Sequence, residues 1–430
     1  MNFQNTLEFA KQLDEQDPLK HFRNKFLIPE VQGNQKIYFL GNSLGLQPKT
    51  VKAALSNILD QWASHGVEGF VAGDNPWLNY HDQLTGPLSK IVGALPGEIV
   101  VMNQLSVNLH LMMKSFYRPV GKKNKIICEA KAFPSDQYMF ETQVRDHGLN
   151  PDEIIVEVKP REGEYSLRTE DIVSTIQQHQ DTVAIVLFSG INYYTGQLFN
   201  IKKITETAQA VGAKCGFDLA HAAGNIPLLL HEWDVDFACW CSYKYLNSGP
   251  GAVGGVFIHE KYHQDISIPR FAGWWGYDKA TRFKMEKGFK PVLTAEGWQL
   301  STPAMLLYAA HKAALDLFEE AGMKNLDTKR KLQNNYLQFI IDDINARQTE
   351  KIMEVITPGN EQERGCQVSL LMLKRGKEIF NELNKREVMA DWREPAVIRI
   401  APVPLYNTFE ELWQFGNIIS SILKQPLTAS

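Results

Sequence analysis

The sequence predicts an α/β protein, with a large domain built on a mostly parallel β-sheet and a smaller α+β domain toward the C-terminus. Three observations support this prediction. A chain of 430 residues is too long for one ordinary hydrophobic core. In its middle part, short apolar runs such as residues 183–188 alternate with amphipathic helical stretches, which is typical of a parallel sheet covered on both faces. Beyond about residue 350 the pattern changes to strands grouped around one helix.

The expected elements of the large domain alternate along the chain. The candidate strands are residues 125–129, 154–158, 182–188, 213–217, 237–241 and 254–258. The candidate helices are 107–117, 170–178 and 201–211, followed by a long helix over 302–322 with Pro303 near its start. In the small domain we expect strands at 367–373 and 397–401 around a helix at 377–386. We therefore divide the chain into an N-terminal segment (1–50), a large domain (51–310) and a small domain (311–430).

The composition argues against several classes of protein. Lys and Arg number 45 against 49 Asp and Glu, a net charge of −4, and no long basic run indicates nucleic acid or an anionic membrane surface. Residues 1–12 lack the apolar core of a signal peptide. Five scattered cysteines indicate reduced thiols and a cytoplasmic location. Cys239 and Cys241 could form half of a metal site, but no second pair has matching spacing, so we expect no metal.

A lysine and an aspartate each follow a buried strand. Lys244 comes shortly after the strand at 237–241 and before a glycine-rich stretch, and Asp218 ends the strand at 213–217, 26 residues earlier (244 − 218). Polar residues at the carboxyl ends of parallel strands face the ligand crevice. Pyridoxal phosphate (PLP) requires this pair, because a lysine binds it covalently and a carboxylate keeps its pyridine nitrogen protonated. The alternatives are a lysine in a surface turn and a helix-capping aspartate.

Two further positions suit a phosphorylated planar cofactor. Ser106 precedes the expected helix at 107–117, where backbone amides and the helix dipole favour phosphate, although a simple N-cap is the alternative. Phe133 follows the strand at 125–129 and could stack on a ring, although such residues more often pack in a core.

Segments spread over nearly the whole chain resemble the kynureninase family. The matching segments are residues 38–48, 131–138, 187–197, 216–222, 235–247, 273–276 and 398–407, in family order. Kynureninases are PLP-dependent enzymes of fold type I, similar to class V aminotransferases. The resemblance therefore implies the PLP-dependent transferase fold for the large domain and PLP as the cofactor.

The resemblance also implies a role for each matching residue. Lys244 would carry the cofactor, Asp218 would pair with the pyridine nitrogen, and Tyr243 would bind phosphate and act as a catalytic acid. Phe133 would stack on the cofactor ring. The other cofactor-binding positions would be Leu105, Ser106, Pro134, Ser135, Asp136, Ser189, His221, Trp274 and Thr302. Asn42 and Ser43 would lie near the substrate, and Arg399 would bind its α-carboxylate.

The implied activity is hydrolytic Cβ–Cγ cleavage of L-kynurenine, and of 3-hydroxykynurenine, to anthranilate or 3-hydroxyanthranilate and L-alanine. The pathway would be tryptophan catabolism or NAD biosynthesis. Trp274 and Thr302 match positions that complete a neighbouring subunit's site, which implies a homodimer. Thr302 replaces the asparagine of many relatives and lacks its amide donor for contacts to the cofactor or a ring substituent. Val67 replaces the histidine of animal relatives, which weakens the case for the 3-hydroxy substrate.

Two other functions stay open at this point. A cysteine desulfurase of the same fold needs a catalytic cysteine on a mobile loop, and Cys366 is the C-terminal candidate, although it enters an apolar strand and resembles a buried hydrophobe. A catalytically silent PLP-binding protein is the other alternative. The presence of Asp218, Lys244 and Arg399 together argues against it.

Overall fold

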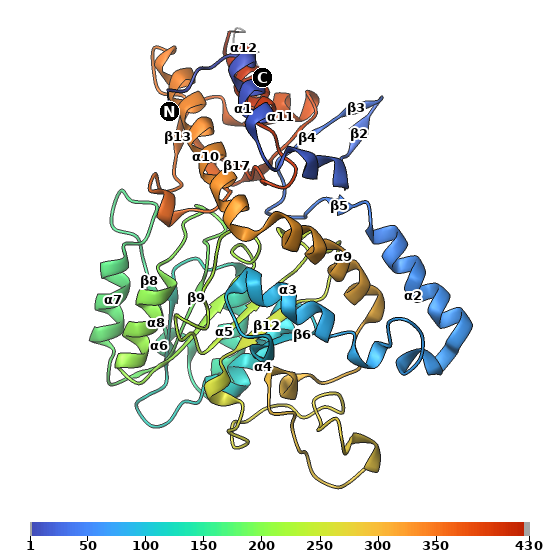
Figure 1. Cartoon of the computed structure of the whole chain (residues 1–430). Coiled ribbons are helices and arrows are strands. Elements are labelled where there is room, and N and C mark those ends of the chain that lie inside the picture. Colours follow the sequence, from blue (N-terminus) through green and yellow to red (C-terminus); the bar gives the residue numbers. More distant parts are fainter. Residues whose placement is uncertain (1, 425–430) are drawn as a thin grey trace.

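A computed structural model describes residues 2–424 and shows two domains stacked on each other (Figure 1). The large domain is built on a seven-stranded sheet. Its strands, in spatial order, are β6 (Ile99–Val101), β12 (Gly255–Ile258), β11 (Phe237–Trp240), β10 (Lys214–Asp218), β9 (Val183–Ser189), β7 (Lys125–Glu129) and β8 (Ile155–Val158). Only β12 runs antiparallel to its neighbours. The predicted α/β class with a mostly parallel sheet is confirmed.

Helices cover both faces of this sheet. They are α2 (Val51–His65), α3 (Asp82–Val92), α4 (Leu105–Phe116), α5 (Pro134–Asp146), α6 (Pro151–Ile154), α7 (Thr169–Gln178), α8 (Ile201–Ala210) and α9 (Met305–Ala321). Alternate residues of β9 enter different cores: Ile185 and Leu187 pack with α4 and α5, whereas Val186 and Phe188 pack with α7, α8 and α9. This double burial explains why the strand is apolar throughout.

The small domain contains a four-stranded antiparallel sheet. Its strands are β13 (Met353–Val355), β14 (Val368–Met372), β17 (Val397–Ile400) and β16 (Asp391–Arg393). The helices α10 (Met323–Ala346), α11 (Gly376–Lys385) and α12 (Phe409–Leu423) pack on this sheet. The N-terminal helix α1 (Leu7–Gln16) buries Ala10 and Leu13 in the same core. The first and last helices thus lie side by side at the top of Figure 1.

The chain between α1 and α2 connects the two domains. Strand β4 (Ile37–Tyr38) pairs with β15 (Val388–Met389) of the small domain, and Leu40 bridges to Ala401. A few residues later, the amide of Gly45 donates to the carbonyl of Tyr243 in the large domain, at 2.8 Å. A Cβ at Gly45 would lie 2.3 Å from the Lys244 carbonyl oxygen, so this close approach requires glycine. The N-terminal loop is therefore fixed beside Lys244.

Three details differ from the sequence prediction. Helix α9 begins at Met305 with Ala304 as its N-cap, so Pro303 lies before the helix and not in its first turn. A proline disfavours the helical region for the residue before it, which argues against a helix that begins at Thr302. Helix α4 begins at Leu105, two residues earlier than expected. The predicted boundary at residue 310 falls within α9, whose side chains belong to the large-domain core. Among the described residues, no helix is long and apolar enough to cross a membrane.

Candidate active site

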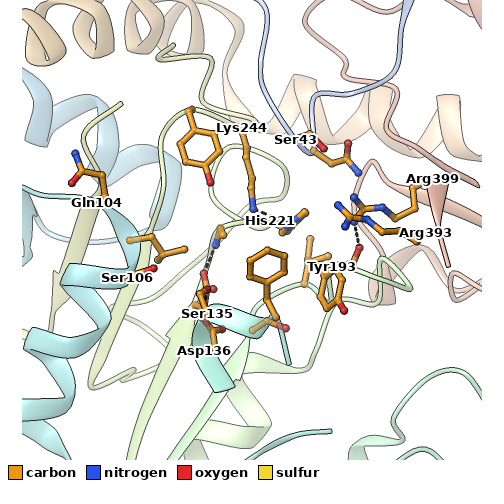
Figure 2. Close-up of a pocket in the computed structure, with 18 residues that line it drawn as sticks. Ser43, Gln104, Ser106, Ser135, Asp136, Tyr193, His221, Lys244, Arg393 and Arg399 are labelled. Atoms are coloured by element: carbon orange, nitrogen blue, oxygen red, sulfur yellow. Dashed lines mark hydrogen bonds between the residues drawn. The ribbon is translucent and has the colours of Figure 1, made fainter. Parts of the chain in front are cut away.

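A cavity of about 350 Å³ lies where the carboxyl ends of β9 and β10 face the small domain. Its walls are contributed by Asn42, Ser43, Gln104, Leu105, Ser106, Phe133, Ser135, Asp136, Ser189, Ile191, Tyr193, Asp218, Ala220, His221, Tyr243, Lys244, Arg393 and Arg399. These residues come from both domains and from the N-terminal loop (Figure 2). The position agrees with the rule that ligands bind at the carboxyl ends of parallel strands.

Lys244 points into this cavity from the turn after β11 (Figure 2). Its Nζ lies 3.0 Å from Nε2 of His221 and 5.9 Å from the ring centroid of Phe133. Burial and the nearby cations, Lys244 first among them, lower the pKa of His221 well below its usual value. His221 is therefore neutral, and its Nε2 accepts a hydrogen bond from the Lys244 amine. The alternative of a lysine in a surface turn is excluded.

Two carboxyl groups meet on the cavity floor. Asp218 ends β10, and its Oδ1 accepts a hydrogen bond from the amide of Ala220 at 2.7 Å. The side chains of Asp218 and Asp136 are hydrogen-bonded to each other. Burial raises the pKa of both, and the neighbouring Asp218 raises that of Asp136 further, whereas Lys244 and the bond from Asp136 lower that of Asp218. The hydrogen bond between the two side chains thus favours the proton on Asp136 and the charge on Asp218.

A third acidic residue, Glu129, supports this floor from the end of β7. The hydroxyl of Ser189 donates to its carboxylate at 2.5 Å and the amide of Ser189 at 3.1 Å. Burial raises the pKa of Glu129 to about 7. Glu129 is not among the predicted site residues, although an acidic residue at the end of the apolar run 125–129 could have indicated it.

The amino end of α4 forms another wall. Leu105 and Ser106 are its first two residues, and within the described chain no side chain caps this end of the helix. Free amides and the positive end of the helix dipole favour a phosphate here. The buried Nδ1 of His221, a residue that lines the cavity, also has no hydrogen-bond partner among residues 2–424. The site thus supplies unused donors and a carboxylate, a set that suits PLP.

The side of the cavity that faces the small domain is lined by amide, hydroxyl and guanidinium groups, from Asn42, Ser43 and Arg399. Asn42 is buried, and its Nδ2 donates to Oε1 of Gln367 at 3.0 Å. Ser43 lies next to it on the same loop and also lines the cavity. Arg399 is 1% exposed; its Nη1 donates to the carbonyl of Tyr193 at 2.5 Å and its Nη2 pairs with Asp391. Arg399 therefore has a structural carboxylate partner and also lines the cavity.

Three predicted site residues do not line the cavity. Pro134 is the first residue of α5, directly after Phe133. Trp274 is 44% exposed and Thr302 is also exposed, both away from this cavity. Conversely, the prediction omitted five lining residues: Gln104, Ile191, Tyr193, Ala220 and Arg393. Ile191 and Tyr193 lie in the matching segment 187–197, so the resemblance could have indicated them.

Solved structures support the fold. A cysteine desulfurase from Thermococcus onnurineus superposes with a TM-score of 0.75 at 17% identity, over 90% of this chain and 95% of that chain. A C-DES mutant with glycine covalently linked to its PLP cofactor superposes with a TM-score of 0.74 at 17% identity, over 89% of this chain and 96% of that chain. Fold and site together define a PLP-dependent enzyme of fold type I.

Sequence relatives identify the family. The kynureninase of Flavobacterium psychrophilum is 54% identical over 97% of this chain and 98% of its own length. Human kynureninase is 46% identical over 96% of this chain and 92% of its own length. Residues 330–419 also match the family model named Kynureninase C-terminal domain. The chain belongs to the kynureninase family, and it is a PLP-dependent hydrolase.

The cysteine desulfurase alternative is limited to a likeness of fold. Cys366 is 1% exposed, and its amide donates to Oδ1 of Asn225 at 2.8 Å, which fixes the backbone there. Burial raises the pKa of its thiol to about 12. A thiol that is inaccessible and protonated cannot act as a nucleophile.

Proposed function

We propose that this chain hydrolyses the Cβ–Cγ bond of L-kynurenine to give anthranilate and L-alanine. Membership of the kynureninase family supports the proposal. The observation that carries it is the position of Lys244, which lies between the Asp218–Asp136 pair and Arg399 in one cavity. An amino acid bound there would have its carboxylate toward the small domain and its amine toward Lys244.

The cavity offers a complete set of residues for PLP. Lys244 would bind it covalently, Asp218 would face the pyridine nitrogen, and Phe133 would stack on the ring. The phosphate group would be held by the start of α4, at Leu105 and Ser106, and by Tyr243. The remaining proposed contacts are Pro134, Ser135, Asp136, Ser189 and His221, with Trp274 and Thr302 supplied by a second subunit. When bound, PLP acts as an electron sink for a carbanion next to the substrate amine.

The chain's own side chains would handle the protons. Lys244 would remove the proton from the substrate Cα and return it at the end of the cycle. Desolvation and the neighbouring Cys241 raise the pKa of Tyr243, so its hydroxyl remains protonated. Tyr243 would give a proton to Cβ after the bond to Cγ breaks. Water adds to the γ-carbonyl, and its oxygen leaves in the carboxylate of anthranilate.

The substrate would be oriented from the small domain. The Arg399 guanidinium would bind the α-carboxylate, because a planar fork of donors matches both oxygens. Asn42 has an Oδ1 without a partner in the described part of the chain, and with Ser43 it would face the rest of the substrate.

We extend the proposal to assembly and location. The chain would act as a homodimer, because Trp274 and Thr302 are exposed in the single chain yet match cofactor-binding positions. The location would be cytoplasmic, since all five cysteines are buried free thiols. The pathway would be tryptophan catabolism or NAD biosynthesis. 3-Hydroxykynurenine would be the secondary substrate, given Val67 and Thr302.

The proposal is tested by offering the purified holoenzyme three substrates in parallel. We expect anthranilate and alanine from L-kynurenine, slower release of 3-hydroxyanthranilate from 3-hydroxykynurenine, and no sulfide from L-cysteine. Sulfide release without anthranilate would support the desulfurase alternative. Full cofactor occupancy without turnover of any of the three would support a silent PLP-binding protein.

A further inference from the structure

Two arginines line the end of the cavity that faces the small domain (Figure 2). Arg393 ends β16 and Arg399 lies on the neighbouring strand β17. Their environments differ, because the Arg393 side chain is 39% exposed and that of Arg399 only 2%. The two strands are antiparallel, with Asp391 paired with Arg399.

Asp391 connects the two guanidinium groups. Its Oδ2 pairs with Nη2 of Arg399, and the same oxygen lies 3.2 Å from both Nε and Nη2 of Arg393. One carboxylate thus faces two guanidinium groups. This end of the cavity therefore keeps one unbalanced positive charge, which a single carboxylate of a ligand would neutralise.

The unused donors are divided between the two arginines. Arg399 donates one N–H of Nη1 to the Tyr193 carbonyl and one N–H of Nη2 to Asp391, which leaves the second N–H of each group. Its buried Nε has no partner in the described chain. Arg393 uses Nε and Nη2 on Asp391, and its Nη1 makes no hydrogen bond within residues 2–424. Each arginine can therefore offer a donor to the same anion without breaking its bond to Asp391.

We propose that Arg393 is a second substrate-binding residue that shares the α-carboxylate of the substrate with Arg399, and that Asp391 is a positioning residue for both. This inference rests on the proposed function. Two charge-assisted hydrogen bonds from different strands fix the direction of the carboxylate as well as its charge. Arg393 then contributes to the selection of amino acids over amines.

The test compares Arg393→Gln and Arg393→Lys with Arg347→Gln. Arg347 is an exposed control that pairs with Asp343 on α10, away from the cavity. For Arg393→Gln we expect the KM for L-kynurenine to rise at least tenfold while kcat changes less than threefold. The inhibition constant of kynuramine, which lacks the carboxylate, should change less than twofold. Arg393→Lys should recover part of the loss, and Arg347→Gln should match the wild type.

A second comparison separates direct contact from an effect through Asp391. Arg393→Gln is repeated in an Asp391→Asn background, where the carboxylate that pairs with both arginines is absent. If Arg393 contacts the substrate, the rise in KM persists at threefold or more; a smaller rise would overturn the inference. An unchanged KM for Arg393→Gln in an otherwise active enzyme would also overturn it. A wild-type enzyme without kynurenine turnover would contradict the proposed function instead.

Discussion

Lys244 is the residue on which the proposed chemistry depends. Its Nζ is 3.0 Å from the neutral His221, inside a cavity that contains Asp218. The sequence predicted this arrangement because both residues follow buried strands, and the carboxyl ends of parallel strands meet at one edge of a sheet.

We therefore expect Lys244→Ala to lose covalent cofactor attachment and kynurenine turnover together. Borohydride reduction of the wild-type holoenzyme should place the PLP mass on the peptide that contains Lys244. The Lys123→Ala variant is a suitable control, because Lys123 donates to the carbonyl of Val211 away from the cavity. A Lys244→Ala protein that is labelled at another lysine would contradict the assignment.

Arg399 should set the affinity for the substrate carboxylate. Loss of a charge-assisted contact to a desolvated carboxylate costs roughly 2–5 kcal/mol, so Arg399→Ala should lower kcat/KM by about 30-fold to several thousand-fold. Arg399→Lys keeps the charge but not the fork and should recover only part of this loss. Steady-state kinetics at full cofactor occupancy measure both. Near-normal kcat/KM in Arg399→Ala would show that the carboxylate binds elsewhere.

Other residues of the site could not be predicted from the strand pattern. Arg393 shares the Asp391 carboxylate with Arg399, so its position in the cavity depends on a residue of the facing strand β17. Tyr193 enters the site through its backbone carbonyl, which accepts from Arg399. Side-chain type gives no signal for such a contact.

At the scale of elements, burial on both faces made the central strands predictable. The bounds of β7 match the expected residues, and β9 and β10 are each shifted by one residue. Strand β6, with three residues, was too short to give a pattern. The predicted start of α9 was wrong because Pro303 lies before the N-cap residue, Ala304.

Helix α9 also carries a buried histidine that should make stability depend on pH. Nδ1 of His311 lies 2.6 Å from Oγ of Ser248, in the loop after Lys244, and burial lowers the pKa of His311 from 6.5 to about 3. Between these values the unfolded chain binds a proton that the folded chain excludes. The free energy of unfolding should therefore fall as the pH drops below 6.5, by about 1.4 kcal/mol per pH unit.

This slope is measured by thermal unfolding at pH 7.5 and 5.5. His311→Gln should be less stable than the wild type at pH 7.5, and the difference should shrink by about 1 kcal/mol at pH 5.5. For His65→Gln, at an exposed position on α2, the difference in stability from the wild type should not shrink between pH 7.5 and pH 5.5. If the difference for His311→Gln stays constant between the two pH values, the buried proton is not responsible.

At the scale of the whole molecule, the predicted class and the two domains followed from chain length and strand pattern. The packing of α1 in the small-domain core could not be predicted, because the pattern of the first 50 residues does not indicate which part of the chain they contact. Trp274 and Thr302 lie outside the cavity of the single chain, and the proposed homodimer would account for their match to cofactor-binding positions.

We expect a homodimer of about twice 48.8 kDa, in which Trp274 reaches the neighbouring site. Trp274→Ala should then be weakly active alone, and mixing it with Lys244→Ala should restore activity. In the mixed dimer one site receives Lys244 from one subunit and Trp274 from the other. Analytical ultracentrifugation gives the mass of the assembly, and native mass spectrometry, which resolves the two variants, confirms that mixed dimers form. Mixed dimers without restored activity, or a fully active monomer, would contradict this assembly.

The claim that this chain hydrolyses a carbon–carbon bond is tested most directly with oxygen-18 water. L-Kynurenine is incubated with the wild-type holoenzyme in this solvent, and the products are analysed by mass spectrometry. We predict equal amounts of anthranilate and L-alanine, with one labelled oxygen in the anthranilate carboxylate, and neither product with Lys244→Ala. Unlabelled anthranilate, or consumption of kynurenine without release of alanine, would contradict the account.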